Sequence, residues 1–290
     1  MANQRVPFRV TAPPPTAPAR TGGRRLHGHL HLTVSPDEAG RTFIRRQSFR
    51  APMHLSKPHL DEGALVVNAV NPTAGLFDGD EVDVDVTVES GARLVLTSPS
   101  ASRVYRARSE TPAIVRQRLT VAEGASAEFF PELFIPQAGS RYHQQTELRV
   151  ADGGQLLYCE WLSPGRVACG ETFAWHELLW DTDVFWSDRL VARERYRLAP
   201  DDASLTALQT LYGQSHYLGF FVLGWPHWPA DELDALHAPG VTCGHGPLTA
   251  GGGTVRLLCA DNLTARRTFA RVRAIFYAAA GRRVPALRRF

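Results

Sequence analysis

The sequence has little lysine, few cysteines and no long apolar run. Lys57 is the only lysine, and every other basic side chain apart from histidine is an arginine, which genome composition explains most simply. The four cysteines lack C-x-x-C spacing, which favours free thiols in a reducing compartment over a disulfide framework. No apolar run approaches the roughly 20 residues that span a bilayer, and no apolar segment follows the N-terminal arginines. These absences predict a soluble, cytoplasmic protein with no membrane partner.

Common catalytic and nucleotide-binding motifs are absent as well. The sequence contains no G-x-S-x-G elbow, no Walker loop and no H-E-x-x-H zinc helix, which counts against hydrolases and nucleotide-dependent enzymes. Nucleic-acid binding is not indicated, because most arginines are spread along the chain. One basic cluster near the C-terminus is either a solvated helix face or a docking surface. Its members are Arg266, Arg267, Arg271, Arg273, Arg282, Arg283, Arg288 and Arg289.

Acidic glycine turns recur in the first half of the chain. Alternating, strand-like runs turn back at Gly91, Gly124 and Gly153, which are 33 and 29 residues apart. This period predicts stacked copies of one β unit, and glycine supplies the positive φ that a tight hairpin needs. Between residues 82 and 88 valine alternates with polar residues, as expected of a strand with one face in a core. The sequence therefore predicts a mainly β fold, a layered β-superhelix or stack of hairpins.

Two helices and one domain complete the predicted organisation. Residues 201–212 carry apolar side chains at helical spacing behind two aspartates. A second helix, at the C-terminus, is predicted over residues 261–280, because an aspartate can cap its start and Gly281 can end it. Residues 1–23 are rich in proline and poor in apolar residues, which predicts a disordered leader. Residues 24–290 are expected to form a single β domain that includes the C-terminal helix.

Carboxylates occur at the expected strand ends and loops, without any accompanying nucleophile or phosphate-binding loop. They could hold a cation loosely, carry one along a channel, or cap turns, and capping is the simplest role for any single one of them. The set comprises Asp78, Asp80, Glu128, Glu132, Glu160 and Glu171.

Two groups of residues could bind a metal ion. His27, His29 and His31 alternate along one expected strand, so their side chains would project from one face and could chelate nickel or zinc. Cys243 and His245 lie in a glycine-rich segment and form a second candidate. Exposed histidines on a strand are also ordinary, and neither group has the four-ligand spacing of a structural zinc site. Both remain hypotheses.

A series of short motifs runs through the chain in a fixed order. It comprises Gly79-Asp80, Gly91-Ala92, Leu96-Thr97-Ser98-Pro99-Ser-Ala101, Val104-Tyr105-Arg106, Glu128-Phe-Phe-Pro131, Gly165-Arg166-x-Ala168-x-Gly170-Glu171-x-Phe173 and Glu194-Arg195. With the closing amphipathic helix, this series resembles the urease accessory protein family UreD, also called UreH, from about residue 26 to the C-terminus. Two places depart from the family pattern. The loop at residues 71–80 lacks the usual Pro-Gly-Gly, and Glu132-Leu133 replaces a Gln-Glu pair, which would move the acidic side chain to the other strand face.

The resemblance implies a fold and a function. Members of this family are non-enzymatic scaffolds with a β-superhelical body and two helices. They join UreF and the GTPase UreG, dock on urease apoprotein, and are thought to contribute a polar tunnel through which nickel passes. Carboxylates suit such a path because a few oxygen ligands hold nickel(II) weakly and transiently, so that no tightly bound cofactor is expected. Carried onto this chain, the nickel path would include Asp80, Glu171, Thr97, Ser98 and Glu132.

Further expectations concern partners and alternatives. Arg166 is expected to pair with a carboxylate and fix its turn. The arginines of the C-terminal helix could steer an acidic partner such as UreF; they are Arg266, Arg267, Arg271 and Arg273. Two other functions stay open at this stage. One is a metal-assisted hydrolase that uses the same carboxylates and histidines, and the other is a β-rich interaction module without a metal role.

Overall fold

The computed structural model describes residues 25–73, 75–130, 133–199 and 216–287, together with Leu205, Ala207 and Thr210. The predicted leader at residues 1–23, Glu132, and most of the predicted helix at 201–212 lie outside these residues. The three described positions of that helix are helical.

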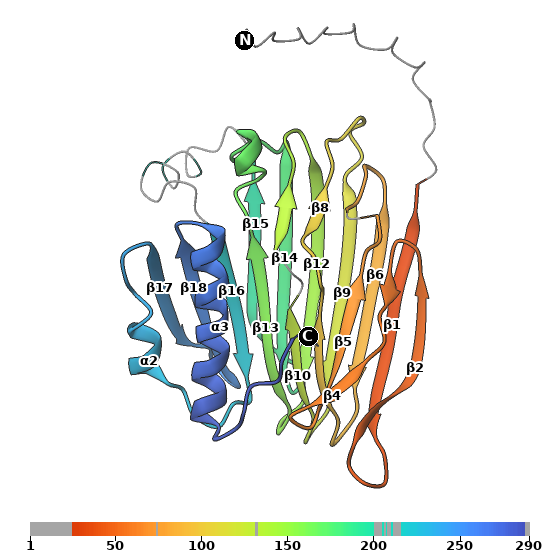
Figure 1. Ribbon diagram of the computed structural model, residues 1–290, viewed down its shortest axis with the longest axis vertical. Helices are drawn as coiled ribbons and strands as arrows, with labels where there is room; N and C mark the ends of the chain where they lie inside the picture. The colour runs from red at the N-terminus through yellow and green to blue at the C-terminus, as the bar shows by residue number, and fades with distance from the viewer. Residues whose placement is uncertain are drawn as a thin grey trace, which may run out of the picture.

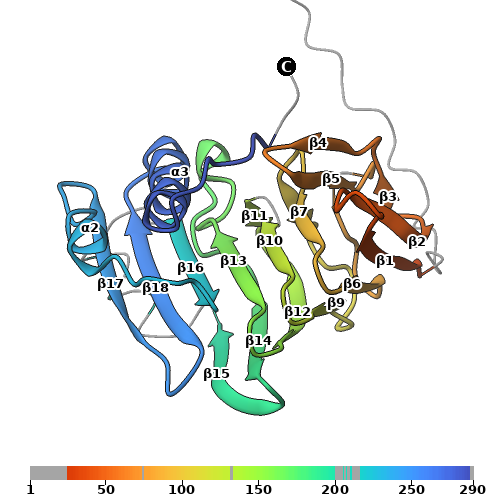
Figure 2. The same cartoon turned by 90° about the horizontal axis from the view of Figure 1, so that it is seen from below.

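The described strands form two stacked sheets, which we call sheet I and sheet II (Figures 1 and 2). Sheet I has the order β15 (Arg189–Leu198), β14 (Glu177–Trp186), β12 (Arg141–Val150), β9 (Ala113–Val121), β6 (Glu81–Val88), β1 (His27–Pro36) and β2 (Thr42–Arg50). Sheet II has the order β17 (Val241–Pro247), β18 (Gly252–Cys259), β16 (His216–Leu223), β13 (Gln155–Leu162), β10 (Ser126–Phe130), β7 (Arg93–Thr97), β5 (Ala64–Val70) and β3 (His54–Leu55). Short strands at its margin are β4 (His59–Asp61), β8 (Ser102–Val104) and β11 (Phe134–Pro136).

The glycine turns connect one sheet to the other. β6 of sheet I leads through Gly91 into β7 of sheet II, and the turns at Gly124 and Gly153 make the same crossing. Successive units pair in parallel, as β6–β9–β12–β14 in sheet I and as β5–β7–β10–β13 in sheet II. The layered, mainly β fold is therefore confirmed. The hairpin form of the turns is wrong, because the two strands that each turn connects lie in different sheets of the described structure and do not pair with each other. The glycines of these turns have φ between +69° and +76°.

The C-terminal helix is confirmed and covers sheet II. α3 (Asn262–Ala279) begins after Asp261, whose side chain accepts a hydrogen bond from the Thr264 N–H at 2.7 Å, and Gly281 follows it with φ +63°. Figures 1 and 2 show α3 and the short α2 (Ala230–Asp234) on the outer side of sheet II. Among the described residues no helix is long and apolar enough to cross a membrane.

Two apolar cores result from this arrangement. One fills the space between the sheets and the other lies between sheet II and the helices. β13 contributes to both cores, which explains why six consecutive residues of this strand are buried. Sheet I has no helix on its outer face among the described elements, and its strands accordingly alternate between buried and polar positions.

Candidate functional site

Five polar side chains lie inside the sandwich, where the core would otherwise be apolar. Gln117 of β9, Thr146 of β12 and Thr182 of β14 stand directly opposite one another across sheet I. Gln144 precedes Thr146 on the same face, and Glu160 of β13 faces them from sheet II. All five are at most 9% exposed. Burying such groups is costly unless they are hydrogen-bonded, so their alignment calls for an explanation. We call them the interior polar row.

Hydrogen bonds connect most of the row. The Gln144 amide accepts from Tyr142 Oη at 2.8 Å and donates to Thr146 Oγ1 at 3.1 Å. The Thr182 hydroxyl donates to Glu160 Oε1 at 2.6 Å and so joins the two sheets. One buried acceptor of the row, Gln117 Oε1, has no hydrogen-bond partner among the described residues. The row therefore keeps a spare acceptor for a polar guest.

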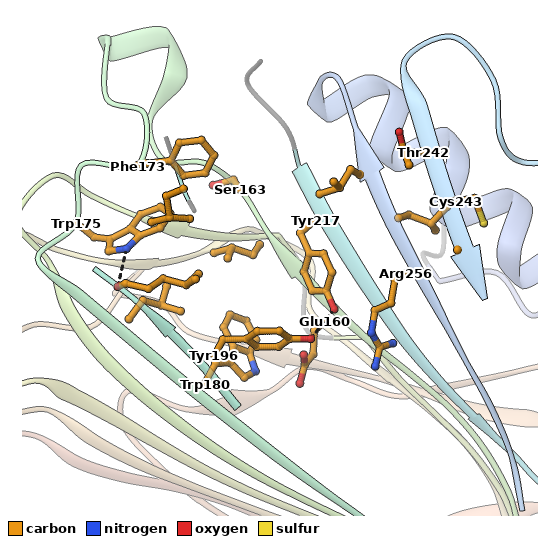
Figure 3. Close-up of a pocket in the computed structure, with 17 residues that line it drawn as sticks. Glu160, Ser163, Phe173, Trp175, Trp180, Tyr196, Tyr217, Thr242, Cys243 and Arg256 are labelled. Carbon is orange, nitrogen blue, oxygen red and sulfur yellow. Dashed lines mark hydrogen bonds between the residues drawn. The ribbon is translucent and has the colours of Figure 1, made fainter. Parts of the chain in front are cut away.

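Two of the cavities in the described chain that adjoin the row bear on its function. A cavity of about 120 Å³ is lined by Gln117 and Gln144, and a cavity of about 450 Å³ is lined by Glu160. Trp180 lines both cavities. The larger cavity lies where β14 and β15 of sheet I face β16 and β18 of sheet II, and its walls are mostly apolar and aromatic (Figure 3).

Glu160 is the ionisable member of the row. Its burial raises its pKa to about 7, against an ordinary value of 4.5, although the hydrogen bond from Thr182 works in the opposite direction. Figure 3 shows its carboxyl group close to Tyr196, Tyr217 and Arg256. A side chain in this state can change between neutral and anionic forms near neutral pH.

A second carboxylate balances the charge of Arg256. The Arg256 guanidinium donates to Glu194 and to the Phe220 carbonyl oxygen, the latter at 2.7 Å. Tyr196 Oη lies 2.5 Å from Glu194 Oε2 and 2.9 Å from Tyr217 Oη. Since Arg256 is already paired with Glu194, Glu160 has no ion pair among the described residues.

Comparison with known proteins identifies the family. The model of the UreD urease accessory protein family matches residues 26–290. The chain belongs to the UreD family. It is 38% identical over 256 residues to the urease accessory protein UreD of Opitutus terrae, which covers 86% of this chain and 93% of that protein. The UreD proteins of Herpetosiphon aurantiacus and Deinococcus radiodurans are each 31% identical, over 74% and 81% of this chain and 74% and 84% of their own lengths. Family membership supports a role in urease maturation.

The UreD motifs place two of the predicted path residues on a cavity. Thr97, which is buried, and Ser98 line the smaller cavity beside the row. Asp80 is also buried, but its two carboxylate oxygens accept hydrogen bonds from the N–H groups of Leu26 and Phe77 at 3.0 and 2.9 Å. Asp80 therefore holds a turn together and is not among the residues that line either cavity.

Glu171 lies in the loop of the same motif series. It accepts hydrogen bonds from the Arg166 guanidinium and from the Ala138 N–H, the latter at 3.0 Å. The predicted pairing of Arg166 with a carboxylate is thus confirmed. The bond from Arg166 is the main reason that the Glu171 pKa is lowered. Glu171 does not line either cavity.

The structure brings some members of the two candidate metal-binding groups close together. The rings of His29 and His31 lie 4.7 Å apart, while His27 Nε2 contacts an Asp83 oxygen at 3.0 Å. Both ring nitrogens of His245 are engaged, one by the Trp228 indole N–H and the other by Asp234. In the part of the chain that the structure describes, no three His, Cys, Asp or Glu side chains are grouped as a metal site would require. Metal binding by these groups stays a prediction.

The arginines of α3 divide into two sets. Arg266, Arg267 and Arg271 are exposed, as expected of a partner-facing surface. Arg273 is only 5% exposed and donates to Glu128 Oε2 at 2.8 Å. Its assignment to that surface is therefore wrong, because the helix turns this position toward sheet II.

Sequence reasoning missed most of the interior polar row. Glu160 was noted among the carboxylates but not placed on the path, although it is the only charged residue in the apolar run of β13. Gln144 and Thr146 could not be recognised as interior residues from the sequence, because β12 is polar on both faces along much of its length. The alternation of the strand could have revealed them, because Gln144 and Thr146 lie two and four residues before the buried Leu148 and therefore share its face.

Proposed function

We propose that this chain serves urease maturation by offering nickel(II) a passage along the interior polar row, while it bridges UreF and UreG to urease apoprotein. The observation that carries the proposal is the row itself, which lies between two cavities in a member of the UreD family. Nickel is cargo in this scheme, and the chain has no catalytic role.

The chemistry of the row suits transient binding. Amide and hydroxyl oxygens are weak ligands for nickel(II), and a single glutamate adds one charge without forming a cage. A path of this kind lets an ion that keeps part of its water shell enter and leave, since conduction requires sites that bind weakly. Glu160, when ionised, would be the strongest ligand along the path. Thr97 and Ser98 would lie near one end of it.

The other predicted residues have smaller roles in this proposal. The oxygens of Asp80 and Glu171 already accept hydrogen bonds from the protein, so each would have to exchange these for nickel. On the outer surface, Arg266, Arg267 and Arg271 of α3 offer positive charge to an acidic partner, for which UreF is our candidate. A tightly held catalytic metal is not favoured by any contact described above.

Two adjacent glutamines of β12 provide the test. Gln144→Leu replaces an interior amide with an apolar side chain of similar size, whereas Gln145→Leu makes the same change at an exposed position. We expect Gln144→Leu to lower urease activation under limiting nickel, with co-purification of UreF, UreG and urease unchanged. Gln145→Leu should activate like the wild type. Full activation by the folded Gln144→Leu variant would refute the passage, and failure of all co-purification would refute the bridging role.

A further inference from the structure

β2 is an edge strand with an unused backbone side. It is the last strand of sheet I, and β1 is the only strand that pairs with it among the described residues. No other backbone hydrogen bond occupies the outer edge between Ile44 and Phe49 in the described chain. The strand contains neither glycine nor proline. Its register with β1 shifts at Arg45, between the pairs Thr33–Arg46 and Val34–Ile44, so the regular part of the edge runs from Arg46 to Phe49. Such an edge is a template for another strand unless something blocks it.

The charge around β2 is one-sided. Residues 41–60 contain four arginines and one lysine but no Asp or Glu. Arg41 and Arg45 are paired with Asp37 and Glu89. Arg46 and Arg50 are exposed, and neither forms an ion pair with another described residue. Their side chains lie on the outer face of sheet I, opposite Thr33 and His29 respectively.

The opposite edge of sheet I offers a comparison. β15 is equally rich in arginine, and two of its four arginines are matched by acids of the neighbouring strand, whereas Arg189 and Arg197 are exposed and have no ion pair among the described residues. Arg193 Nε lies 2.7 Å from Asp183 Oδ1, and Arg195 Nε lies 3.8 Å from Asp181 Oδ2. β2 differs from β15 in that its unmatched arginines lie in a segment without any acidic residue, whereas β15 itself contains Glu194.

Two exposed phenylalanines flank this edge. Phe43 is 44% exposed and Phe49 is 39% exposed. Phe49 stands opposite Leu30, whose side chain is in the core, and Phe43 stands opposite Ser35, five positions further along β1. The two rings therefore lie on opposite faces of β2, at opposite ends.

We propose that β2 receives an extended, acidic segment of a partner protein as an added strand of sheet I. The backbone of the segment pairs with the outer edge of β2. Its carboxylates alternate on the outer face beside Arg46 and Arg50, and its apolar residues lie on the inner face beside Phe49. Main-chain hydrogen bonds supply affinity, and the arginines select an acidic strand over others.

Other occupants fit less well. A second copy of this chain would bring the same unmatched arginines against one another, which disfavours β2–β2 pairing. A nucleic acid would match the charge, but stacking of successive bases needs aromatics on one face. Phe43 and Phe49 are on opposite faces.

A peptide that alternates glutamate with valine, as long as β2, is the probe. We expect it to bind the full chain in a fluorescence anisotropy titration, with affinity that falls as salt rises. Arg46→Glu/Arg50→Glu should weaken binding about tenfold. Arg193→Glu/Arg195→Glu makes the same change in net charge on β15 and should weaken it much less.

Backbone methylation separates strand addition from charge attraction. Two further probes carry N-methyl groups on alternate amides, in one phase or the other. An added strand turns only one set of amides toward β2, so one probe should lose binding and the other should keep it. Equal behaviour of the two methylated probes, equal losses in the β2 and β15 variants, or tighter binding of oligothymidylate than of the peptide would each overturn the proposal.

Discussion

Glu128 and Glu160 lie on the paired strands β10 and β13 of sheet II and are 3% and 2% exposed. They face opposite ways. Glu128 points toward α3, where Arg273 and Tyr277 both donate to it. Glu160 points into the sandwich, where Thr182 is its close donor and no ion pair forms among the described residues. One buried carboxylate is thus neutralised by a cation, while the other is left with a pKa of about 7.

The difference separates a structural site from the site that we propose to be functional. The Glu128–Arg273 pair attaches the C-terminal helix to the sheet and leaves little room for another ligand. Glu160 has the opposite properties, since a cavity adjoins it and no described residue forms an ion pair with it. A chain that only needed stability would place an apolar residue at such a position. The cost of retaining Glu160 supports its place on the proposed path.

The largest expected change in stability follows from removing the cation beside Glu128. Arg273→Met leaves a buried carboxylate unpaired and should lower the free energy of unfolding by about 3–5 kcal/mol. Urea denaturation measures this value. Arg267→Met, on the exposed side of the same helix, should change it by less than about 0.5 kcal/mol. If the two variants were equally stable, Glu128 would not depend on Arg273, and the contrast with Glu160 would disappear.

Glu160→Gln tests the other half of the comparison through pH. The folded pKa of about 7 exceeds the ordinary 4.5, so between these pH values the folded chain retains a proton that the unfolded chain releases. The wild type therefore loses stability as pH rises through this window, by up to about 3 kcal/mol, and the loss levels off above pH 7.

The glutamine variant lacks this titration. Its stability relative to the wild type should therefore increase between pH 4.5 and 8, as measured by urea denaturation at both pH values. Parallel profiles for the two proteins would mean that Glu160 titrates normally. Arg267→Met provides a second reference, because it keeps Glu160 and leaves Glu128 paired with Arg273, so it should retain the wild-type slope in this window.

The fold was predictable to the level of its layers. Valine alternation in β6 and the spaced glycines indicate stacked β units, and Asp261 and Gly281 bound the C-terminal helix. The sheet that each strand joins could not be predicted, because a glycine with positive φ serves a hairpin and a crossing equally well. Strand register across the sandwich is a tertiary property that local patterns do not determine.

The site was predictable only in part. The family motifs located Thr97 and Ser98 on a cavity, but they also pointed to Asp80 and Glu171, whose carboxylates hold turns. Short motifs rich in glycine mark turns, and a carboxylate there is readily used by nearby N–H groups. The pairing of Glu128 with Arg273 spans 145 residues, so no local pattern could predict it.

The smallest expected change in stability is at Glu171, a carboxylate that is ion-paired like Glu128 but is partly exposed to solvent. Its side chain is 18% exposed, and that of its partner Arg166 is 40% exposed. Glu171→Ala should therefore change the free energy of unfolding less than Arg273→Met or Glu160→Gln does, because partly solvated ion pairs contribute little to stability. The local effect should be clear, since the Ala138 N–H loses its acceptor and its hydrogen exchange should accelerate by roughly tenfold. Glu232→Ala, at an exposed position of α2, should leave that exchange rate unchanged.

The pH dependence at Glu171 should have the opposite sign to that of Glu160. Its pKa is lowered, chiefly by the hydrogen bond from Arg166, so its contribution to stability is present above the ordinary pKa of 4.5 and is lost as pH falls through the folded value. The stability of the wild type minus that of Glu171→Ala should consequently increase as the pH rises, whereas the stability of the wild type minus that of Glu160→Gln should decrease as the pH rises toward 8. If both differences changed in the same direction, the assignment of one carboxylate to a turn and the other to the path would be wrong.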